Sequence, residues 1–272
     1  MICIGSKYEH DAIDRWLDVR VGNMEELETA LHSCQGEGDI LVFWLAVNNV
    51  TGEICPIIDI GKLCKKYGAY YICDATAMVG HATIPKDVDQ WCSMMIIDGH
   101  KIGTQLGIGC MWICDEFNKW LVGMKLHGTP NLAGTISIAD AVEWACDSKR
   151  LNDINNWYMR LFDYLYCGLK IADIDFSVIA DMCPSTCAIN AIRLNGLNAD
   201  AVQQYAASKG VYIGVGGSAC NAAGDFRVLN AYGLSNAEAA EVIRVSFGYE
   251  TTKDDINKLV GVIKEYKERF VV

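Results

Sequence analysis

The chain has 272 residues, of which 51% are hydrophobic and 21% are charged, so it can bury a large core as one large or two modest domains. Its formal net charge is −11, and because no basic segment offsets this acidic excess, the composition argues against binding to nucleic acid. The sequence also lacks an apolar run of membrane-spanning length and the features of a signal peptide. We therefore expect a cytoplasmic protein that contacts neither nucleic acid nor a membrane.

The thirteen cysteines are scattered through apolar runs and do not show the paired spacing of a zinc site or a disulfide framework. Free cysteine behaves as a small hydrophobic residue when it is buried in a reducing compartment. We expect most of these thiols to be core residues, and we expect no metal site.

The first half of the chain alternates short apolar runs with segments of helical periodicity. Strands are predicted at residues 1–4, 39–47, 69–73, 94–97 and 110–113. Helices are predicted at residues 11–19, at 24–31 with Asn23 as the cap, and at 56–66 with Gly68 as the stop. This alternation predicts an α/β domain with a mainly parallel sheet.

Polar side chains follow three of the predicted strands: Asn49, Asp74 and Lys101. Because open α/β sheets place ligand chemistry beyond the carboxyl ends of their strands, we expect these side chains to converge. Lys101 lies in a hairpin-like loop between two strands, where a desolvated amine could form a Schiff base with a carbonyl such as that of pyridoxal phosphate. An ordinary turn lysine is the alternative that these residues alone leave open.

The order of elements changes in the second half. A long amphipathic helix is predicted over residues 137–169, followed by strands at 188–194, 211–213 and 245–247 and helices at 199–208, 237–243 and 253–270. We therefore expect two domains, with a large α/β domain at residues 1–136, and the long connecting helix and a smaller α+β domain at 137–272.

Two residues of the second half could take part in catalysis or substrate binding. Cys220 lies in a glycine-rich loop, where packing gives no reason for a thiol, so it is either a nucleophile or an incidental cysteine. Arg244 lies between apolar neighbours, where a buried guanidinium needs an anionic partner. That partner is either a structural carboxylate or the carboxylate of a bound substrate.

Taken together, five segments resemble the class V aminotransferases and, within them, the cysteine desulfurases. They are Glu9-His10; Val47-Asn48-Asn49 with Gly52 and Pro56-Ile57; Asp74-Ala75-Thr76 with Val79-Gly80; Gly99-His100-Lys101-Ile102 with Gly107-Ile108-Gly109; and Gly217-Ser218-Ala219-Cys220 with Leu234, Ile243-Arg244 and Thr251-Thr252. The resemblance covers nearly the whole chain. It implies the fold of the pyridoxal phosphate-dependent transferases, with a truncated large domain and a smaller C-terminal α+β domain.

The resemblance also implies an activity, the removal of sulfur from L-cysteine to give alanine and a persulfide on Cys220. Lys101 would hold pyridoxal 5'-phosphate as a Schiff base, and Asp74 would pair with the protonated ring nitrogen. His10 would stack on the ring as a catalytic residue, and His100 would contact the phosphate.

Further residues are implied on the substrate side. Asn49 would bond the ring hydroxyl oxygen or the substrate carboxylate, and Arg244 would bind that carboxylate through two hydrogen bonds. Thr135 matches a threonine that reaches the phosphate of the other subunit, which implies a homodimer. A sulfur-acceptor or scaffold protein, as in iron–sulfur cluster assembly, would be the partner.

The sequence departs from the family in the predicted phosphate site. The family's chain extends upstream of the first strand and carries there a glycine-threonine turn that cradles the phosphate. Asp98 replaces the usual serine, Ala77 replaces a glutamine, and the loop at 127–135 is shorter and lacks the family's arginines. These departures favour an alternative, a degenerate member that acts as a binding or regulatory subunit. A lyase acting on selenocysteine or another amino acid is a further alternative, which would share Lys101 and Asp74.

Overall fold

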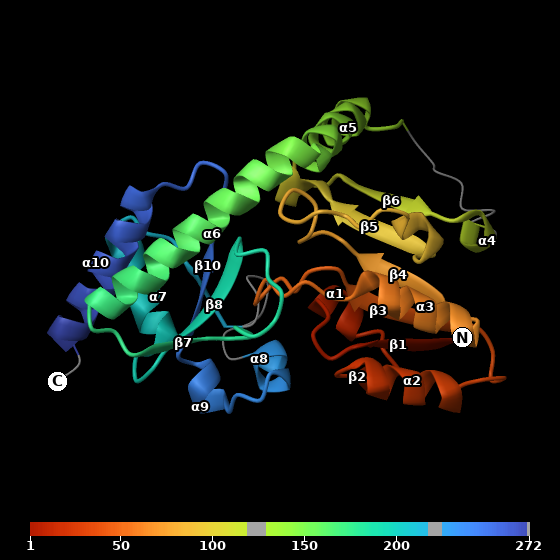
Figure 1. Cartoon of the computed structure of the whole chain (residues 1–272), viewed down its shortest axis with the longest axis horizontal. Coiled ribbons are helices and arrows are strands. Elements are labelled where there is room, and N and C mark those ends of the chain that lie inside the picture. The colour runs from red at the N-terminus through yellow and green to blue at the C-terminus, as the bar shows by residue number, and fades with distance from the viewer. Residues whose placement is uncertain (119–128, 217–224, 271–272) are drawn as a thin grey trace. The chain divides into compact units, whose positions relative to one another are not determined.

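The structure, a computed structural model, describes residues 1–118, 129–216 and 225–270, whose elements are shown in Figure 1. The chain divides into two compact units. The first unit comprises Met1–Asn48 and Ile54–Leu151, and the second comprises Asn49–Glu53 and Asn152–Val272. Within the described residues, no helix is both long enough and apolar enough to span a membrane.

The described part of the first unit contains a six-stranded sheet. In sheet order, its strands are β2 (Val19–Val21), β1 (Ile2–Ser6), β3 (Ile40–Leu45), β4 (Tyr70–Asp74), β5 (Met94–Asp98) and β6 (Gly109–Ile113). The first five strands are parallel to their neighbours, and β6 runs antiparallel to β5. The prediction of a mainly parallel α/β sheet is confirmed, and so is the hairpin-like connection that carries Lys101.

Helices connect these strands or follow the last of them. They are α1 (Asp11–Asp14), α2 (Met24–Ser33), α3 (Ile57–Tyr67), α4 (Asp115–Asn118), α5 (Leu132–Cys146) and two short 3₁₀ turns, η1 (Val88–Gln90) and η2 (Gly99–Ile102). Asn23 caps α2 by accepting the Glu26 N–H at 2.9 Å, as predicted. Gly68 ends α3 in the left-handed conformation, with a φ of 68°, as predicted.

One predicted helix is shorter than its periodicity indicated. The helix expected over residues 11–19 ends at Asp14, and β2 follows it. The carboxylate of Asp18 accepts the backbone N–H of Cys3 at 2.9 Å and so holds the segment beside β1. This contact between residues distant in sequence competes with local helical propensity, and the pairing with β1 prevails.

The expected continuous helix over residues 137–169 is two helices, α5 and α6 (Ser148–Ile171), separated by Asp147 in an extended conformation. The observed division between the units therefore differs from the expected one at residue 136. Ala145 of α5 is fully buried in the core of the first unit, so α5 belongs there, and the longer segment of the second unit starts at Asn152.

The described part of the second unit is an α+β arrangement around a four-stranded antiparallel sheet. In sheet order, its strands are β7 (Phe176–Val178), β8 (Ile189–Leu194), β10 (Val242–Ser246) and β9 (Gly214–Val215). Its helices, besides α6, are α7 (Ala199–Ser208), α8 (Arg227–Ala231), α9 (Asn236–Ala239) and α10 (Lys253–Phe270). Apolar side chains from α6, α7 and α10 join those of β8 and β10 in one core.

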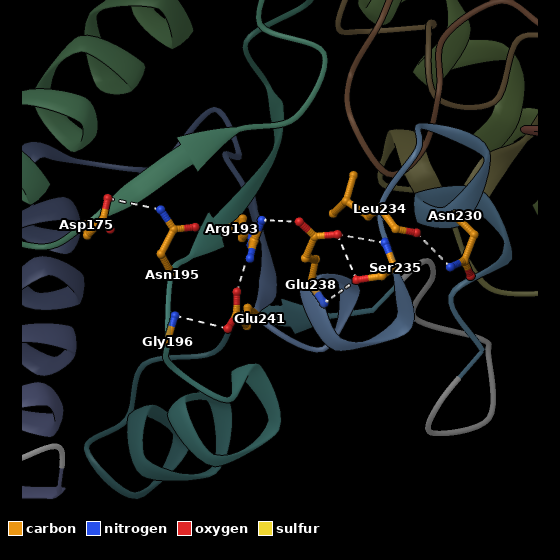
Figure 2. Close-up of polar contacts among 9 residues, drawn as sticks. All are labelled: Asp175, Arg193, Asn195, Gly196, Asn230, Leu234, Ser235, Glu238 and Glu241. Atoms are coloured by element: carbon orange, nitrogen blue, oxygen red, sulfur yellow. Dashed lines mark hydrogen bonds and ion pairs between the residues drawn. The ribbon is translucent and has the colours of Figure 1, made fainter.

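A polar network links β8 to the segment before β10 (Figure 2). The Arg193 guanidinium donates from Nε to Glu241 at 2.7 Å and from Nη1 to Glu238 at 2.8 Å. Glu238 in turn accepts the N–H of Ser235 at 2.9 Å, which completes a capping box at the start of α9. We call Arg193, Glu238 and Glu241 the Arg193 cluster. The helix predicted over 237–243 ends at Ala239, because residues 242–246 pair as β10 instead.

Candidate active site

Asp74 and Lys101 follow two adjacent parallel strands of the first unit. Asp74 is the last residue of β4 and is half-buried, with its Oδ1 accepting the N–H of Thr76 at 2.9 Å. Lys101 lies in η2, directly after β5, and its side chain is exposed. A carboxylate and an amine therefore follow neighbouring strand ends, the edge at which this class of sheet places its ligands.

Asp98, the last residue of β5, forms the tightest polar contact in this region. Its Oδ1 lies 2.7 Å from His100 Nδ1 and accepts the His100 backbone N–H at 3.1 Å. Its own backbone N–H donates to Thr76 Oγ1 at 3.2 Å. Thr76 thus connects the ends of β4 and β5, a role that its place two residues after Asp74 could have suggested.

The turn that carries Lys101 is closed around Gly99. A Cβ on this residue would lie 2.3 Å from Thr104 Oγ1 and 2.8 Å from the Ile108 carbonyl oxygen, so only glycine fits. The Gly99 N–H donates to Ile108 O at 3.0 Å, and the Thr104 N–H donates to Gly99 O at 3.1 Å. These bonds fix the backbone on both sides of Lys101 while leaving its side chain exposed.

Two more predicted residues of the first unit lie at helix starts. His10 is half-buried, and its Nδ1 accepts the Ala12 N–H at 3.2 Å at the start of α1. Its neighbour Glu9 was given no role from the sequence. Glu9 is buried and accepts the Leu45 N–H at 2.8 Å. Glu9 therefore ties the turn that carries His10 to the end of β3. Thr135 is exposed in α5, and its hydroxyl donates to Asn131 O at 2.9 Å.

The second unit brings the two predicted substrate-binding residues together. Arg244 is half-buried in β10, and its Nη1 donates to the Asn49 carbonyl oxygen at 3.1 Å. The Oδ1 atom of Asn49 is buried and has no hydrogen-bond partner among the described residues. Gly214 of β9 lies beside this arginine, because a Cβ there would be 3.2 Å from Arg244 Nε. Because Asn49 belongs to the second unit, its expected convergence with Asp74 and Lys101 stays a prediction.

Cys220, the predicted sulfur nucleophile, lies outside the described residues. Among the described cysteines, every shifted thiol pKa is raised. Burial raises the pKa of Cys64 to about 12, and a hydrogen bond from Cys92 together with burial raises the pKa of Cys73. A raised pKa reduces the thiolate fraction, so these thiols are less reactive than a free cysteine. Among the described cysteines, Cys64, Cys73 and Cys92 are buried, and the others are partly or fully exposed, so the expectation that most are core residues is wrong for the described part of the chain.

The described residues fit one part of pyridoxal phosphate better than the other. In the first unit the ring side fits, because a half-buried carboxylate and an exposed amine lie at the ends of adjacent strands. In the second unit, the buried Oδ1 of Asn49, which lacks a hydrogen-bond partner among the described residues, could accept a hydrogen bond from a ligand. His100, the residue expected to contact the phosphate, fits that role poorly, because both its Nδ1 and its backbone N–H are paired with Asp98. Elsewhere in the described residues, no group of three His, Cys, Asp or Glu side chains is placed to hold a metal ion.

The sequence of this chain is similar to those of known proteins. Residues 15–259 match the family described as aminotransferase class-V. A cysteine desulfurase IscS from Dictyoglomus turgidum is 26% identical over 85% of this chain and 60% of its own length. A probable mitochondrial cysteine desulfurase from Dictyostelium discoideum is 27% identical over 84% of this chain and 52% of its own length. The chain therefore spans between half and two thirds of these curated relatives.

The fold comparison agrees with the predicted fold class. The structure of a NifS-like protein from Rickettsia africae matches with a TM-score of 0.85 at 21% identity, covering 98% of this chain and 76% of that chain. A cysteine desulfurase from Thermococcus onnurineus, in its apo form, matches with a TM-score of 0.75 at 19% identity. The prediction of a mainly parallel large domain with a smaller α+β domain is confirmed.

Proposed function

The chain belongs to the aminotransferase class-V family, and from that premise we propose that it is a pyridoxal phosphate-dependent cysteine desulfurase. The observation that carries the proposal is the placement of Asp74 and Lys101 after adjacent parallel strands. Further support comes from the relatives, several of which are named cysteine desulfurases. In the proposed reaction, the sulfur of L-cysteine passes to the Cys220 thiol, and the products are alanine and a persulfide on Cys220.

The first unit would hold the cofactor. Lys101 offers an exposed amine for covalent attachment, and the Asp74 carboxylate would keep the ring nitrogen protonated. When bound, the cofactor supplies an electron sink that weakens bonds at the substrate's Cα. His10 would pack against the ring, with its orientation set by the hydrogen bond from Ala12 and by the buried anchor of Glu9.

The second unit would hold the substrate. We assign the carboxylate of L-cysteine to Arg244, since a guanidinium binds a carboxylate through two parallel hydrogen bonds. Asn49 supports this placement through its backbone carbonyl oxygen, which accepts a hydrogen bond from Arg244 Nη1. Its buried side-chain Oδ1 is an acceptor, and it would gain a partner from a donor group of the ligand, such as the amino group of L-cysteine. Recovering that missing hydrogen bond would favour the bound state.

Cys220 would be the nucleophile that attacks the substrate sulfur. In the sequence, Cys220 follows Gly214, Gly216 and Gly217, and packing gives no reason for a thiol in so glycine-rich a segment. The further steps require partners, and we propose a homodimer, in which Thr135 meets the cofactor phosphate of the other subunit, and a sulfur-acceptor protein. Cytoplasmic location is part of the same proposal.

The test uses the full 272-residue chain, supplied with pyridoxal phosphate and L-cysteine. Wild type should release sulfide in the presence of a thiol reductant and carry a persulfide detectable by mass spectrometry. Cys220→Ala should lose both signals while keeping covalent cofactor on Lys101. Cys167→Ala, which removes an exposed cysteine of α6, is the matched control and should behave as wild type.

Two other results would redirect the proposal. Unchanged sulfide release from Cys220→Ala would favour a lyase acting on cysteine, selenocysteine or another amino acid. Failure of the wild type to attach the cofactor would favour a degenerate member that acts as a binding or regulatory subunit. The contact between Asp98 and His100 favours this second candidate, the binding or regulatory subunit, because it uses donors that a phosphate would need.

A further inference from the structure

The polar groups around Lys101 are already paired with one another. Asp98 Oδ1 lies 2.7 Å from His100 Nδ1 and accepts the His100 N–H at 3.1 Å. The Asp98 N–H donates to Thr76 Oγ1 at 3.2 Å, and the Thr76 N–H donates to Asp74 Oδ1 at 2.9 Å. The Asp98 carboxylate thus pairs with two donors of His100 that an incoming anion would otherwise use.

The backbone of the same turn is closed as well. The N–H groups of Gly99 and Thr104 both donate to carbonyl oxygens within the β5–β6 connection, at 3.0 and 3.1 Å. The tight packing around Gly99 resists widening of this turn, since a single added carbon would meet Thr104 Oγ1 at 2.3 Å. Turning these N–H groups toward a phosphate would therefore break several bonds at once.

The charges near Lys101 also disfavour a bound phosphate. Asp74 and Asp98 are the last residues of adjacent strands, so two carboxylates lie close in the fold to the turn that contains Lys101. The Asp98 side chain is 45% exposed and that of His100 is 35% exposed, so this pair faces the solvent from which a ligand arrives. A phosphate dianion near Asp98 would meet a like charge, whereas an uncharged carbonyl group would not.

We propose that Asp98 is a specificity-determining residue, which makes the site accept an aromatic aldehyde through Lys101 and Asp74 without any gain from a phosphate on that aldehyde. The inference rests on the proposed function, in which Lys101 attaches the cofactor and His100 lies on its phosphate side. It adds a ligand class to that function, because pyridoxal should bind this chain as well as pyridoxal phosphate does.

The experiment titrates the full chain with pyridoxal and with pyridoxal phosphate at low salt, following absorbance and tryptophan fluorescence. For the wild type, the two dissociation constants should agree within about threefold. Asp98→Ser removes the like charge and supplies a hydroxyl donor, so it should tighten pyridoxal phosphate binding about tenfold, the size of one partly solvated charge contact, and leave pyridoxal unchanged. Asp98→Asn keeps an acceptor for the His100 N–H and should give an intermediate gain.

The controls separate charge from folding. Asp59→Ser removes an exposed carboxylate of α3 that is paired with Lys62 at 3.1 Å, and it should change neither affinity. Thermal unfolding of each variant, followed by circular dichroism, reports whether the turn has been lost; if Asp98→Ser is unstable, Asp98→Asn decides the question.

The outcomes are distinct. A wild type that binds pyridoxal phosphate more than tenfold tighter than pyridoxal overturns the inference and leaves the proposed function standing. Equal affinity gains for both ligands in Asp98→Ser overturn it too, because the effect would not involve the phosphate. If neither ligand leaves a borohydride-stable adduct on Lys101, the proposed function fails, and the inference fails with it.

Discussion

The end of β5 and the Arg193 cluster are both compact polar networks, yet their surroundings differ. In the Arg193 cluster, one guanidinium meets two carboxylates, and Glu241 also accepts the Gly196 N–H at 3.1 Å (Figure 2). Each of these bonds joins segments that the fold must hold together. At the end of β5, by contrast, one bond joins the Asp98 N–H to Thr76 after β4, and the other bonds fix a four-residue turn and leave an exposed lysine amine.

This difference separates a network that stabilises the fold from one that presents a reactive group. A side chain whose polar atoms pair within the fold contributes to stability, and its removal lowers the free energy of unfolding. An exposed amine on a fixed turn contributes little to stability but is positioned for a ligand. Substitutions in the two regions should therefore separate unfolding from cofactor attachment.

The largest effect is expected for Lys101→Ala. The substitution removes the amine, so borohydride-stable attachment of pyridoxal phosphate should be abolished, as measured by mass spectrometry. The unfolding midpoint should stay that of the wild type, because the side chain is exposed. A Lys101→Ala protein that retained the wild-type adduct would place the attachment site elsewhere.

Arg244→Ala should have the next largest effect. Loss of two charge-assisted hydrogen bonds to the substrate carboxylate, worth about 1.5–3 kcal/mol, should raise the KM for L-cysteine by roughly ten-fold or more. Cofactor attachment in the first unit should remain intact. Arg244→Lys keeps the charge but not the two parallel donors, so it should recover only part of the loss. An unchanged KM in both variants would contradict the assignment.

Much of the first unit could be predicted from local sequence. The runs that became β3, β4 and β5 are short and apolar, and Asn23 and Gly68 signal helix ends by chemistry that acts within a few residues. Asp74 and Lys101 could therefore be placed at strand ends from the sequence, and the structure adds that these two strands are neighbours. The antiparallel strand β6 likewise followed from the apolar run after the Lys101 turn.

Two kinds of feature were missed, contacts between residues distant in sequence and a local pairing within a turn. Residues 49–53 belong to the second unit because Asn49 O meets Arg244, 195 positions away, and because Gly52 O accepts the Thr186 N–H at 3.1 Å. The pairing of Asp98 with His100 is local, but it depends on the fold of a turn that periodicity does not specify. Contacts of both kinds are invisible to strand and helix patterns.

A moderate loss of stability is expected when the Arg193 cluster is broken. Glu241→Gln keeps the shape but removes the charge from the 2.7 Å bond with Arg193, and should lower the free energy of unfolding by about 1 kcal/mol. Urea unfolding measures this change, while attachment of pyridoxal phosphate to Lys101 should be unaffected. A loss of attachment without a loss of stability would reverse the roles that we assign to the two regions.

The smallest effect is a pH dependence carried by Glu238. Hydrogen bonds from the Ser235 N–H and hydroxyl, with Arg193 nearby, hold the pKa of this carboxyl below its ordinary value of 4.5. Because the folded pKa is below the unfolded one, the stabilisation is complete above pH 4.5 and is lost as the pH falls through the folded pKa. Glu238→Gln should therefore unfold at lower urea than the wild type at pH 7, and this difference should shrink at acidic pH. Glu268→Gln, which removes an exposed carboxylate 3.7 Å from Lys264 in α10, is the control and should show a smaller difference at pH 7. A difference for Glu238→Gln that stayed constant down to pH 3 would mean that its charge does not stabilise the fold.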